Sequence, residues 1–197
     1  MSETKKLSPS TAYILRLAGT LLAITAVTAL LLGLVNYITA PTIEARDLKK
    51  QQEAMAAVLP ADSYEAVEGF APTGQVTALY EAVTGGQLSG YVAEVTSNGF
   101  GGAMSVTVGI NAAGAVSGVV VTGHEETPNV GSRVVDSPEV LAQFIGLTGT
   151  ITVNTGENKI DAVSGATVST NGVTDAVNAA LAAVLARQPV LQGAEEG

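Results

Sequence analysis

Cysteine and tryptophan are absent from this 197-residue chain, and histidine occurs once. Without cysteine, the chain forms no disulfide and supplies no thiolate ligand to zinc or to an iron–sulfur cluster. His124 is the single histidine, so a histidine-cluster metal site is excluded, as is any Ser-His-Asp arrangement that does not use it. These absences remove the commonest metal and hydrolase chemistries.

Basic side chains are scarce in most of the chain. After Lys50 there are three, Arg133, Lys159 and Arg187, against fifteen Asp and Glu, which gives this part a net charge of −12. Such an acidic surface repels nucleic acid, so we expect no nucleic-acid partner. It also has few cations for a free dianionic phosphate, so a bound phosphate would need backbone amides, a helix end or a covalent link.

One uncharged apolar segment lies near the N-terminus. About 20 such residues, rising about 1.5 Å each, cross the hydrocarbon layer of about 30 Å. We predict a single transmembrane helix, in contact with membrane lipid, over residues 17–40, ended by Pro41. A cleaved signal peptide is the alternative, but the segment is too long, and Ile38 and Pro41 do not fit the cleavage pattern around Ala40.

The orientation is predicted from what flanks the span. Three basic residues precede it and three follow it, so the count of basic residues alone is balanced. A short basic tail before the span and an acidic part after it favour a cytoplasmic tail over residues 1–16. The rest of the chain is then expected outside the cytoplasm, on the cell (inner) membrane.

Residues 41–77 are predicted to form a helical stalk and linker. Residues 44–59 are good helix formers without Gly or Pro and are followed by Pro60. Residues 61–77 mix Gly, Pro, Asp and Glu without a clear period, which is typical of irregular structure.

Residues 78–188 are predicted to form an α+β domain with a largely antiparallel sheet packed by helices. Alternation of apolar and small polar residues, with a turn at 111–114, predicts the sheet. The strands are expected at 91–96, 104–110, 115–122 and 150–153. An apolar stripe at helical spacing predicts a final amphipathic helix through Val173, Ala176, Val177, Ala180, Leu181, Val184 and Leu185. Pro189 would end this helix, and residues 189–197 are expected to be a disordered tail.

Small polar residues gather where this helix is expected to begin, near Thr170. The segment from Asp161 to Thr170 reads DAVSGATVST. Such residues often cap a helix, contributing about 1 kcal/mol. The free amides and dipole of a helix start also stabilise phosphate, and a hydroxyl there can be esterified.

The stretch D-x-x-S-G-A-T at 161–167 looks like the acceptor sequence read by the extracytoplasmic flavin transferase, which moves FMN from FAD onto the final Thr. Three further stretches follow the same order: LKKQQEAMAAVLPA at 48–61, NGFGG at 98–102 and GHEETPNVG at 123–131. Together they resemble the RnfG family, the G subunits of the Rnf electron-transport complex, over nearly the whole chain. Agreement of several landmarks is much stronger than one short motif.

The resemblance implies a covalent phosphodiester between FMN and Thr167. A phosphodiester keeps one negative charge rather than two, which suits a domain with three basic side chains. The glycines of the NGFGG stretch would approach the flavin ring, or simply form a bulge before a strand. Glu126 and Thr127 would supply polar groups near the flavin, or belong to a solvated loop. The supporting residues are expected to be Ser164, Gly165, Ala166, Ser169, Thr170, Gly99, Gly101 and Gly102.

One loop departs from the family pattern: Asn129 stands where the family commonly has Gly, and Asn tolerates left-handed backbone. By resemblance, the complex passes electrons between ferredoxin and NAD and couples this to Na⁺ or H⁺ movement. Its partners would be other integral-membrane, iron–sulfur and flavin subunits, with the flavin transferase needed for maturation. The alternatives are the C subunit of the sodium-pumping NADH:quinone reductase, another anchored covalent flavoprotein, or an anchored adhesion domain without flavin.

Overall fold

The computed structural model describes residues 9–187, in two compact units that meet between Lys49 and Lys50. The first eight residues of the predicted cytoplasmic tail and the predicted disordered tail at 189–197 lie outside the described residues.

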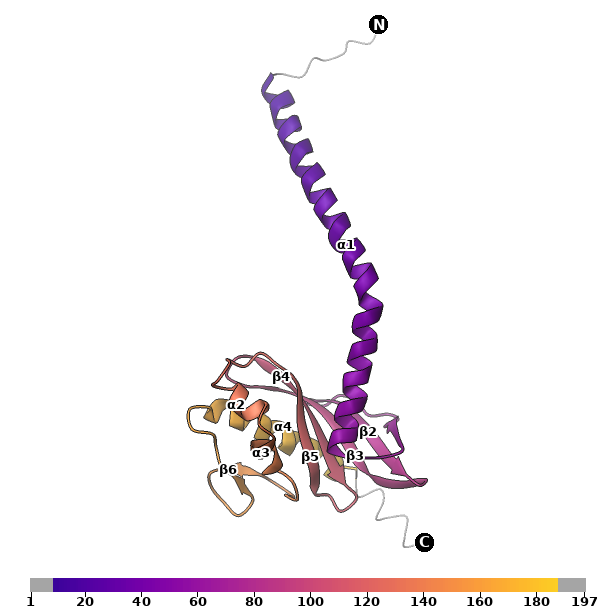
Figure 1. Ribbon diagram of the computed structural model, residues 1–197, viewed down its shortest axis with the longest axis vertical. Coiled ribbons are helices and arrows are strands. Elements are labelled where there is room, and N and C mark those ends of the chain that lie inside the picture. The colour runs from indigo at the N-terminus through magenta and orange to yellow at the C-terminus, as the bar shows by residue number, and fades with distance from the viewer. Residues whose placement is uncertain (1–8, 188–197) are drawn as a thin grey trace. The chain divides into compact units, whose positions relative to one another are not determined.

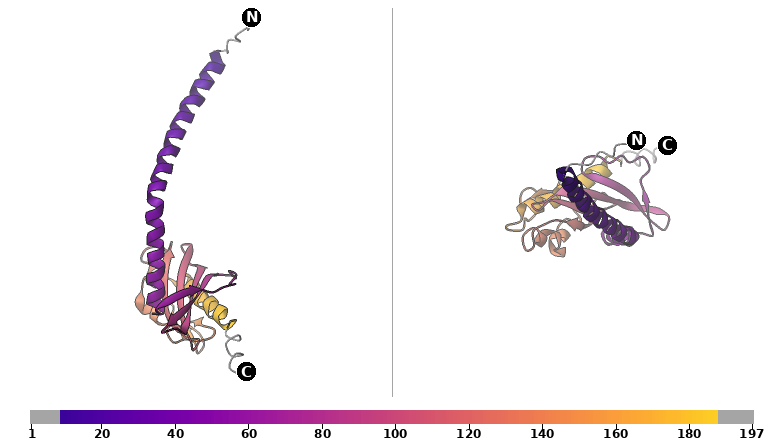
Figure 2. Two further views of the ribbon diagram at one scale, coloured as in Figure 1. Left: turned by 90° about the vertical axis from the view of Figure 1, so that its right-hand side faces the viewer. Right: turned by 90° about the horizontal axis from the view of Figure 1, so that it is seen from above.

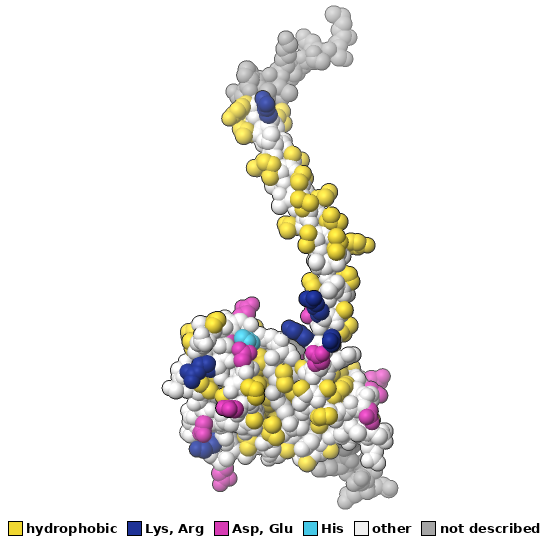
Figure 3. All heavy atoms as spheres, viewed as in Figure 1, with side chains coloured by type: hydrophobic (Ala, Val, Ile, Leu, Met, Phe, Trp, Pro, Cys, Tyr) yellow, Lys and Arg dark blue, Asp and Glu magenta, His cyan; other side chains and the backbone are white. Residues whose placement is uncertain are grey.

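The first unit is formed by most of helix α1, Pro9–Val58. Within the described residues it is the one helix long and apolar enough to cross a membrane, with a mean hydropathy of 2.2 in its most apolar part. Apolar side chains are spread along its visible surface, between basic side chains near the two ends (Figure 3). The hydroxyls of Thr20, Thr25 and Thr28 donate to carbonyls one turn earlier in the same helix. The helix therefore satisfies these polar groups internally, as a lipid environment requires.

The prediction that Pro41 ends the apolar helix is wrong. Pro41 lies inside α1, which continues without a break into the stretch predicted as a separate stalk helix. A proline removes one backbone donor, at a cost of about 3 kcal/mol in a helix interior. Good helix formers follow Pro41 up to Val58, so the helix resumes after the local defect.

The second unit, from Lys50 onward, is built on a five-stranded sheet in which each strand pairs antiparallel with the next along the chain (Figure 1). The sheet register makes the β3–β4 pair the longest ladder, from Gly90 opposite Asn111 to Asn98 opposite Ala103. The predicted fold class, α+β with a largely antiparallel sheet, is confirmed. The strands are β1 Ser63–Ala66, β2 Val76–Thr84, β3 Gln87–Asn98, β4 Ala103–Asn111 and β5 Val116–His124.

The irregular linker predicted at 61–77 is wrong in two places, because it contains β1 and the start of β2. The sequence of β2, VTALYEAVT, does not alternate strictly, because the register with β3 shifts at Val76/Ala78 and again at Ala82/Val83. β1 is short and mostly exposed, so it leaves almost no apolar signal. The second unit, called the soluble unit from here on, therefore begins earlier than the predicted boundary at residue 78.

Helix α4, Thr167–Leu185, covers one face of the sheet, as Figure 2 shows in yellow. The side chains of Ala93, Val108 and Ile110 on that face are fully buried in one core with α4. Six of the seven predicted stripe residues are buried, but Leu185 is 47% exposed because it is the last residue of the helix. The remaining elements are α2 Ser132–Val135, α3 Pro138–Ala142 and the parallel pair β6 Thr152–Val153 and β7 Lys159–Ile160.

The last turn of α1 packs on the opposite face of the sheet. Met55, Val58 and Leu59 form a small separate core with Ala82 and Val92. Ser117 Oγ donates to the Val58 carbonyl over 2.7 Å. A Cβ at Gly109 would lie 2.5 Å from that carbonyl oxygen, and one at Gly118 would lie 2.8 Å from Val58 Cα. Two glycines therefore allow the helix backbone to sit directly on the sheet.

Tyr80 packs beside this small core, and its titration is expected to lower the stability of the fold at high pH. Burial, and next the charge of Glu94, raise the pKa of the Tyr80 phenol, while a hydrogen bond from Gln51 lowers it. A raised pKa favours the neutral phenol in the folded chain. That stabilisation is complete below the unfolded-state pKa of about 10 and is lost as pH rises through the folded-state pKa.

We therefore expect the free energy of unfolding to fall above about pH 10, and to fall less steeply in Tyr80→Phe. Urea unfolding of both chains between about pH 8 and about pH 11.5 measures this. Equal slopes for the two chains would show that Tyr80 does not carry the effect.

Candidate functional site

Thr167 is the first residue of α4, three residues earlier than the predicted helix start at Thr170. The residue before it, Ala166, occupies the N-cap position and makes no side-chain cap hydrogen bond. The Ser and Thr side chains of this segment therefore do not cap the helix. Instead, Thr170 Oγ1 donates to the Ala166 carbonyl over 3.0 Å, inside the helix.

The helix start has unused backbone donors. Thr170 N donates to the Ala166 carbonyl over 2.9 Å, so the helical ladder begins there. Within residues 9–187, the N–H groups of Thr167, Val168 and Ser169 have no hydrogen-bond partner. Free donors at the positive end of a helix suit a phosphate. This donor set fits an FMN phosphate on Thr167.

The chain reaches Thr167 through a tight turn. Gly165 has φ +81°, a conformation that favours glycine, and Ala166 N donates to the Val163 carbonyl over 2.9 Å. Ser164, Gly165 and Thr167 are exposed, whereas Ala166 is buried. The turn thus places the Thr167 side chain at the surface with small, exposed residues before it.

A buried carboxylate lies behind this helix start. Glu126 is only 6% exposed, and within the described residues no Lys or Arg forms an ion pair with it. Its Oε1 accepts from Phe100 N over 2.9 Å, and its Oε2 accepts from Gly101 N over 3.3 Å and from Ser169 Oγ over 2.9 Å. A hydrogen bond to a charged group contributes about 1.5–3 kcal/mol. Three donors therefore replace the water that this carboxylate loses.

Neighbouring glycines leave the space that the Glu126 side chain occupies. A Cβ at Gly99 would overlap Glu126 Oε1, and one at Gly131 would overlap Glu126 Oε2 and lie 2.7 Å from Ser169 Oγ. At Gly101 a Cβ would overlap the Glu125 carbonyl oxygen. These glycines are therefore needed for close approach within the protein. Their contact with a flavin ring, like that of Gly102, stays a prediction.

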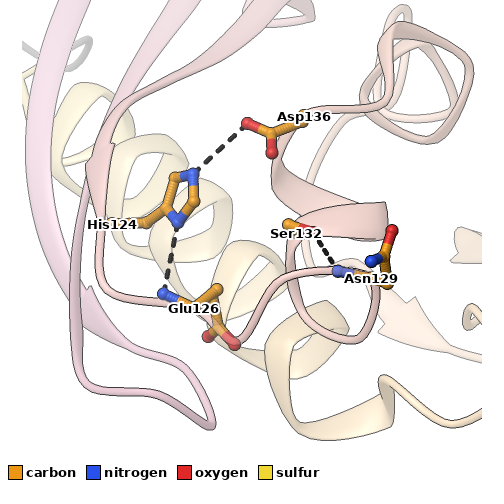
Figure 4. Close-up of polar contacts among 5 residues, drawn as sticks. All are labelled: His124, Glu126, Asn129, Ser132 and Asp136. Carbon is orange, nitrogen blue, oxygen red and sulfur yellow. Dashed lines mark hydrogen bonds and ion pairs between the residues drawn. The ribbon is translucent and has the colours of Figure 1, made fainter.

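The backbone around Glu126 is fixed by the single histidine. His124 Nδ1 accepts from Glu126 N over 3.2 Å, and His124 Nε2 lies 3.2 Å from Asp136 Oδ1 at the end of α2. Figure 4 shows the imidazole between these two groups, with the Glu126 carboxylate pointing away from the ring. Because Nδ1 accepts a hydrogen bond, we assign the Nε2–H tautomer, which donates to Asp136.

The loop at 123–131 keeps its turn, although Asn129 stands where the family commonly has glycine. Asn129 has φ +61°, in the left-handed region, and its N–H group donates to Ser132 Oγ over 2.9 Å. Thr127 is exposed, and its carbonyl accepts from Val130 N over 3.1 Å. The polar contact of Thr127 with the flavin therefore stays a prediction, made from an exposed position.

The structure brings the three predicted segments together at one place: the NGFGG loop, the loop at 123–131 and the first turn of α4. Sequence reasoning missed Gly131, and it missed Gly172, whose Cβ would lie 2.5 Å from the Asn98 carbonyl oxygen. A glycine inside a strongly amphipathic helix was the available signal. It also missed three exposed apolar side chains, one on each segment: Phe100, Val130 and Val168.

A separate apolar groove of about 410 Å³ lies beside β5 and contains none of the predicted site residues. Val119, Val121, Leu141 and Ile145 are among the side chains that line it. The candidate site lies outside this groove. It is the exposed helix start at Thr167, supported by the buried carboxylate of Glu126.

Comparison with known families defines the class of protein. Residues 99–182 match the family described as the FMN-binding domain, and this range contains every predicted site residue. Residues 7–58, which include the whole of α1, match the RnfG N-terminal region. The soluble unit is thus an FMN-binding domain that follows an RnfG-type helix.

Two relatives extend the match to the whole chain. The G subunit of the ion-translocating oxidoreductase complex of Methanosarcina acetivorans is 32% identical, over 95% of this chain and 100% of its own. The G subunit of the Na⁺-translocating ferredoxin:NAD⁺ oxidoreductase complex of Acetobacterium woodii is 29% identical, over 90% of this chain and 95% of its own. The chain belongs to the RnfG family, the G subunits of Rnf-type ion-translocating oxidoreductase complexes.

One solved structure that matches is the C subunit of the Na⁺-translocating NADH-quinone reductase of Parabacteroides distasonis, with a TM-score of 0.45 and 19% identity. The match covers 53% of this chain and 58% of that chain. The family assignment rests on the sequence matches.

Proposed function

We propose that this protein is the electron-carrying G subunit of an Rnf complex, with FMN joined covalently through its phosphate to Thr167. One observation carries the proposal: in a chain of this family, the last residue of D-x-x-S-G-A-T is an exposed threonine at a helix start with three free N–H groups. Those groups and the helix dipole stabilise an anion, which an acidic domain otherwise does poorly.

The bond would form by transfer from FAD, held by a flavin transferase. The Thr167 oxygen attacks the phosphorus on the FMN side of the pyrophosphate and forms the new P–O bond. The pyrophosphate bridge breaks, AMP leaves with the bridging oxygen, and the hydroxyl proton is released. The resulting phosphodiester would carry one negative charge, and the free N–H groups of Val168 and Ser169 would be the donors available to hold it.

Bound FMN supplies one- and two-electron redox chemistry, so the protein needs no acid, base or nucleophile for that step. We propose that α1 spans the membrane with its first residues in the cytoplasm and the soluble unit on the outer face. There the protein would relay electrons between ferredoxin and NAD within the complex, coupled to Na⁺ or H⁺ movement. Integral-membrane, iron–sulfur and flavin subunits would be its partners. The relatives' names and the apolar helix support this assignment.

The proposal is tested by expressing the full chain with and without the flavin transferase. With the transferase, we expect a fluorescent band on a denaturing gel and an intact mass raised by FMN less one water. Without it, we expect the unmodified mass. A nonfluorescent band of unmodified mass in both preparations would leave an anchored adhesion domain as the better account.

Copurification separates the remaining alternatives. A member of the Rnf complex is expected to copurify with integral-membrane partners and an iron–sulfur protein from its native membrane. Copurification with NADH:quinone reductase subunits would instead assign the chain to that complex. A fluorescent chain that purifies alone from gently solubilised membrane would be an independent anchored flavoprotein.

A further inference from the structure

Glu126 has a role that follows from its contacts. We propose that Glu126 is a positioning residue, which holds the first turn of α4 by hydrogen bonds through Ser169 so that Thr167 faces the flavin transferase. The inference rests on the proposed attachment of FMN to Thr167. It differs from the flavin contact that the family resemblance implies for Glu126.

The Glu126 carboxylate connects two segments of the chain. Ser169 lies two residues after Thr167, and its Oγ donates to Glu126 Oε2 over 2.9 Å. The same carboxylate accepts from Phe100 N over 2.9 Å and from Gly101 N over 3.3 Å. One side chain therefore joins the β3–β4 loop to the first turn of α4.

The first turn of α4 has a buried, hydrogen-bonded side and an exposed side. Ser169 and Thr170 are fully buried, and both hydroxyls donate inside the protein. Thr167 and Val168 are exposed. Holding the buried side fixes where the turn points, so the hydroxyl that must reach the transferase is displayed on the other side.

Glu126 does not act directly on the Thr167 hydroxyl. Both carboxylate oxygens already accept hydrogen bonds within the protein, and the residue is 6% exposed. A general base for Thr167 would need a free oxygen within reach of its hydroxyl, and within the described residues Glu126 bonds the hydroxyl of Ser169 only. The geometry therefore assigns Glu126 a supporting role.

Glu126 is itself held in place by its neighbours. His124, fixed by Asp136, accepts from the Glu126 backbone, as Figure 4 shows. A Cβ at Gly131 would overlap Glu126 Oε2. The carboxylate is thus confined on several sides, and a shorter or missing side chain at 126 would leave the three donors without an acceptor.

The experiment measures the rate at which purified full-length chain, in detergent, gains the mass of FMN when mixed with flavin transferase and FAD. We expect Glu126→Ala and Ser169→Ala to be slower than wild type, by about tenfold and severalfold. The double variant should be no slower than Glu126→Ala, because both remove one connection. Glu126→Gln keeps an acceptor for Phe100 N and can donate to Ser169 Oγ. It gives up the longest of the three hydrogen bonds, that from Gly101 N over 3.3 Å, so we expect a rate within about threefold of wild type.

Each outcome supports or overturns the inference. A Glu126→Ala chain modified at the wild-type rate overturns it, and so does Glu126→Gln as slow as Glu126→Ala, which would indicate action by charge. If Glu126→Ala does not fold, Ser169→Ala at the wild-type rate overturns it. Gly118→Ala, which is expected to weaken the fold on the sheet face opposite α4, should keep the wild-type rate. If wild type itself gains no FMN, the proposed function fails first.

Discussion

Thr167→Val is expected to abolish covalent flavin while leaving the protein folded. Valine keeps the branched shape of threonine but has no hydroxyl to join to phosphorus. Thr167 is exposed, and its hydroxyl makes no hydrogen bond within the described residues, so stability should change by less than about 0.5 kcal/mol. The variant, expressed with the flavin transferase, should give a nonfluorescent band and the unmodified mass.

Two controls locate the bond. Thr167→Ser keeps a hydroxyl at the same place and should still gain the mass of FMN. Thr148→Val removes an exposed threonine outside the motif and should be modified like wild type. Persistence of the FMN mass in Thr167→Val would place the bond on another hydroxyl. Ser164 would then be the first candidate, because Ser169 and Thr170 are buried and bonded.

The sequence allowed the main elements to be predicted where a period was clear. Strand β4 and helix α4 were found because their apolar residues alternate or recur at helical spacing over many residues. The continuation of α1 through Pro41 was missed, because a proline by itself predicts a helix end. The helix formers that follow Pro41 outweigh it. The short segments α2 and α3 have no period long enough to detect.

The candidate site could be located from the sequence, but its internal contacts could not. The motif singled out Thr167, and the order of the loops indicated which segments belong with it. That Glu126 turns inward to Ser169 depends on the meeting of segments 43 residues apart. Charge alone suggests an exposed side chain, since Glu is rarely buried without a partner. Only the fold brings two backbone amides and a hydroxyl to this carboxylate.

The last turn of α1 lies directly on the sheet, so replacing a glycine beneath it with alanine should lower stability instead of raising it. Alanine in place of a strand glycine is ordinarily stabilising by about 0.5–1 kcal/mol. Gly118→Ala is expected to destabilise the soluble unit by about 1–3 kcal/mol or more, because the added Cβ would lie 2.8 Å from Val58 Cα and 2.9 Å from its carbonyl oxygen. These are backbone atoms, so no side chain can rotate away. The hydrogen bond from Ser117 Oγ to that carbonyl would be strained as well.

Gly123 lies on the same strand and is the matched control, because a Cβ there would meet nothing closer than 4.0 Å. The melting temperature of Gly118→Ala should fall by about 2–4 °C for each kcal/mol lost, while that of Gly123→Ala should be unchanged or slightly raised. Amide hydrogen exchange at residues 55–59 should become faster only in Gly118→Ala, because the last turn of α1 would no longer pack closely on the sheet. Equal melting temperatures for the two variants would show that this turn can shift on the sheet at little cost.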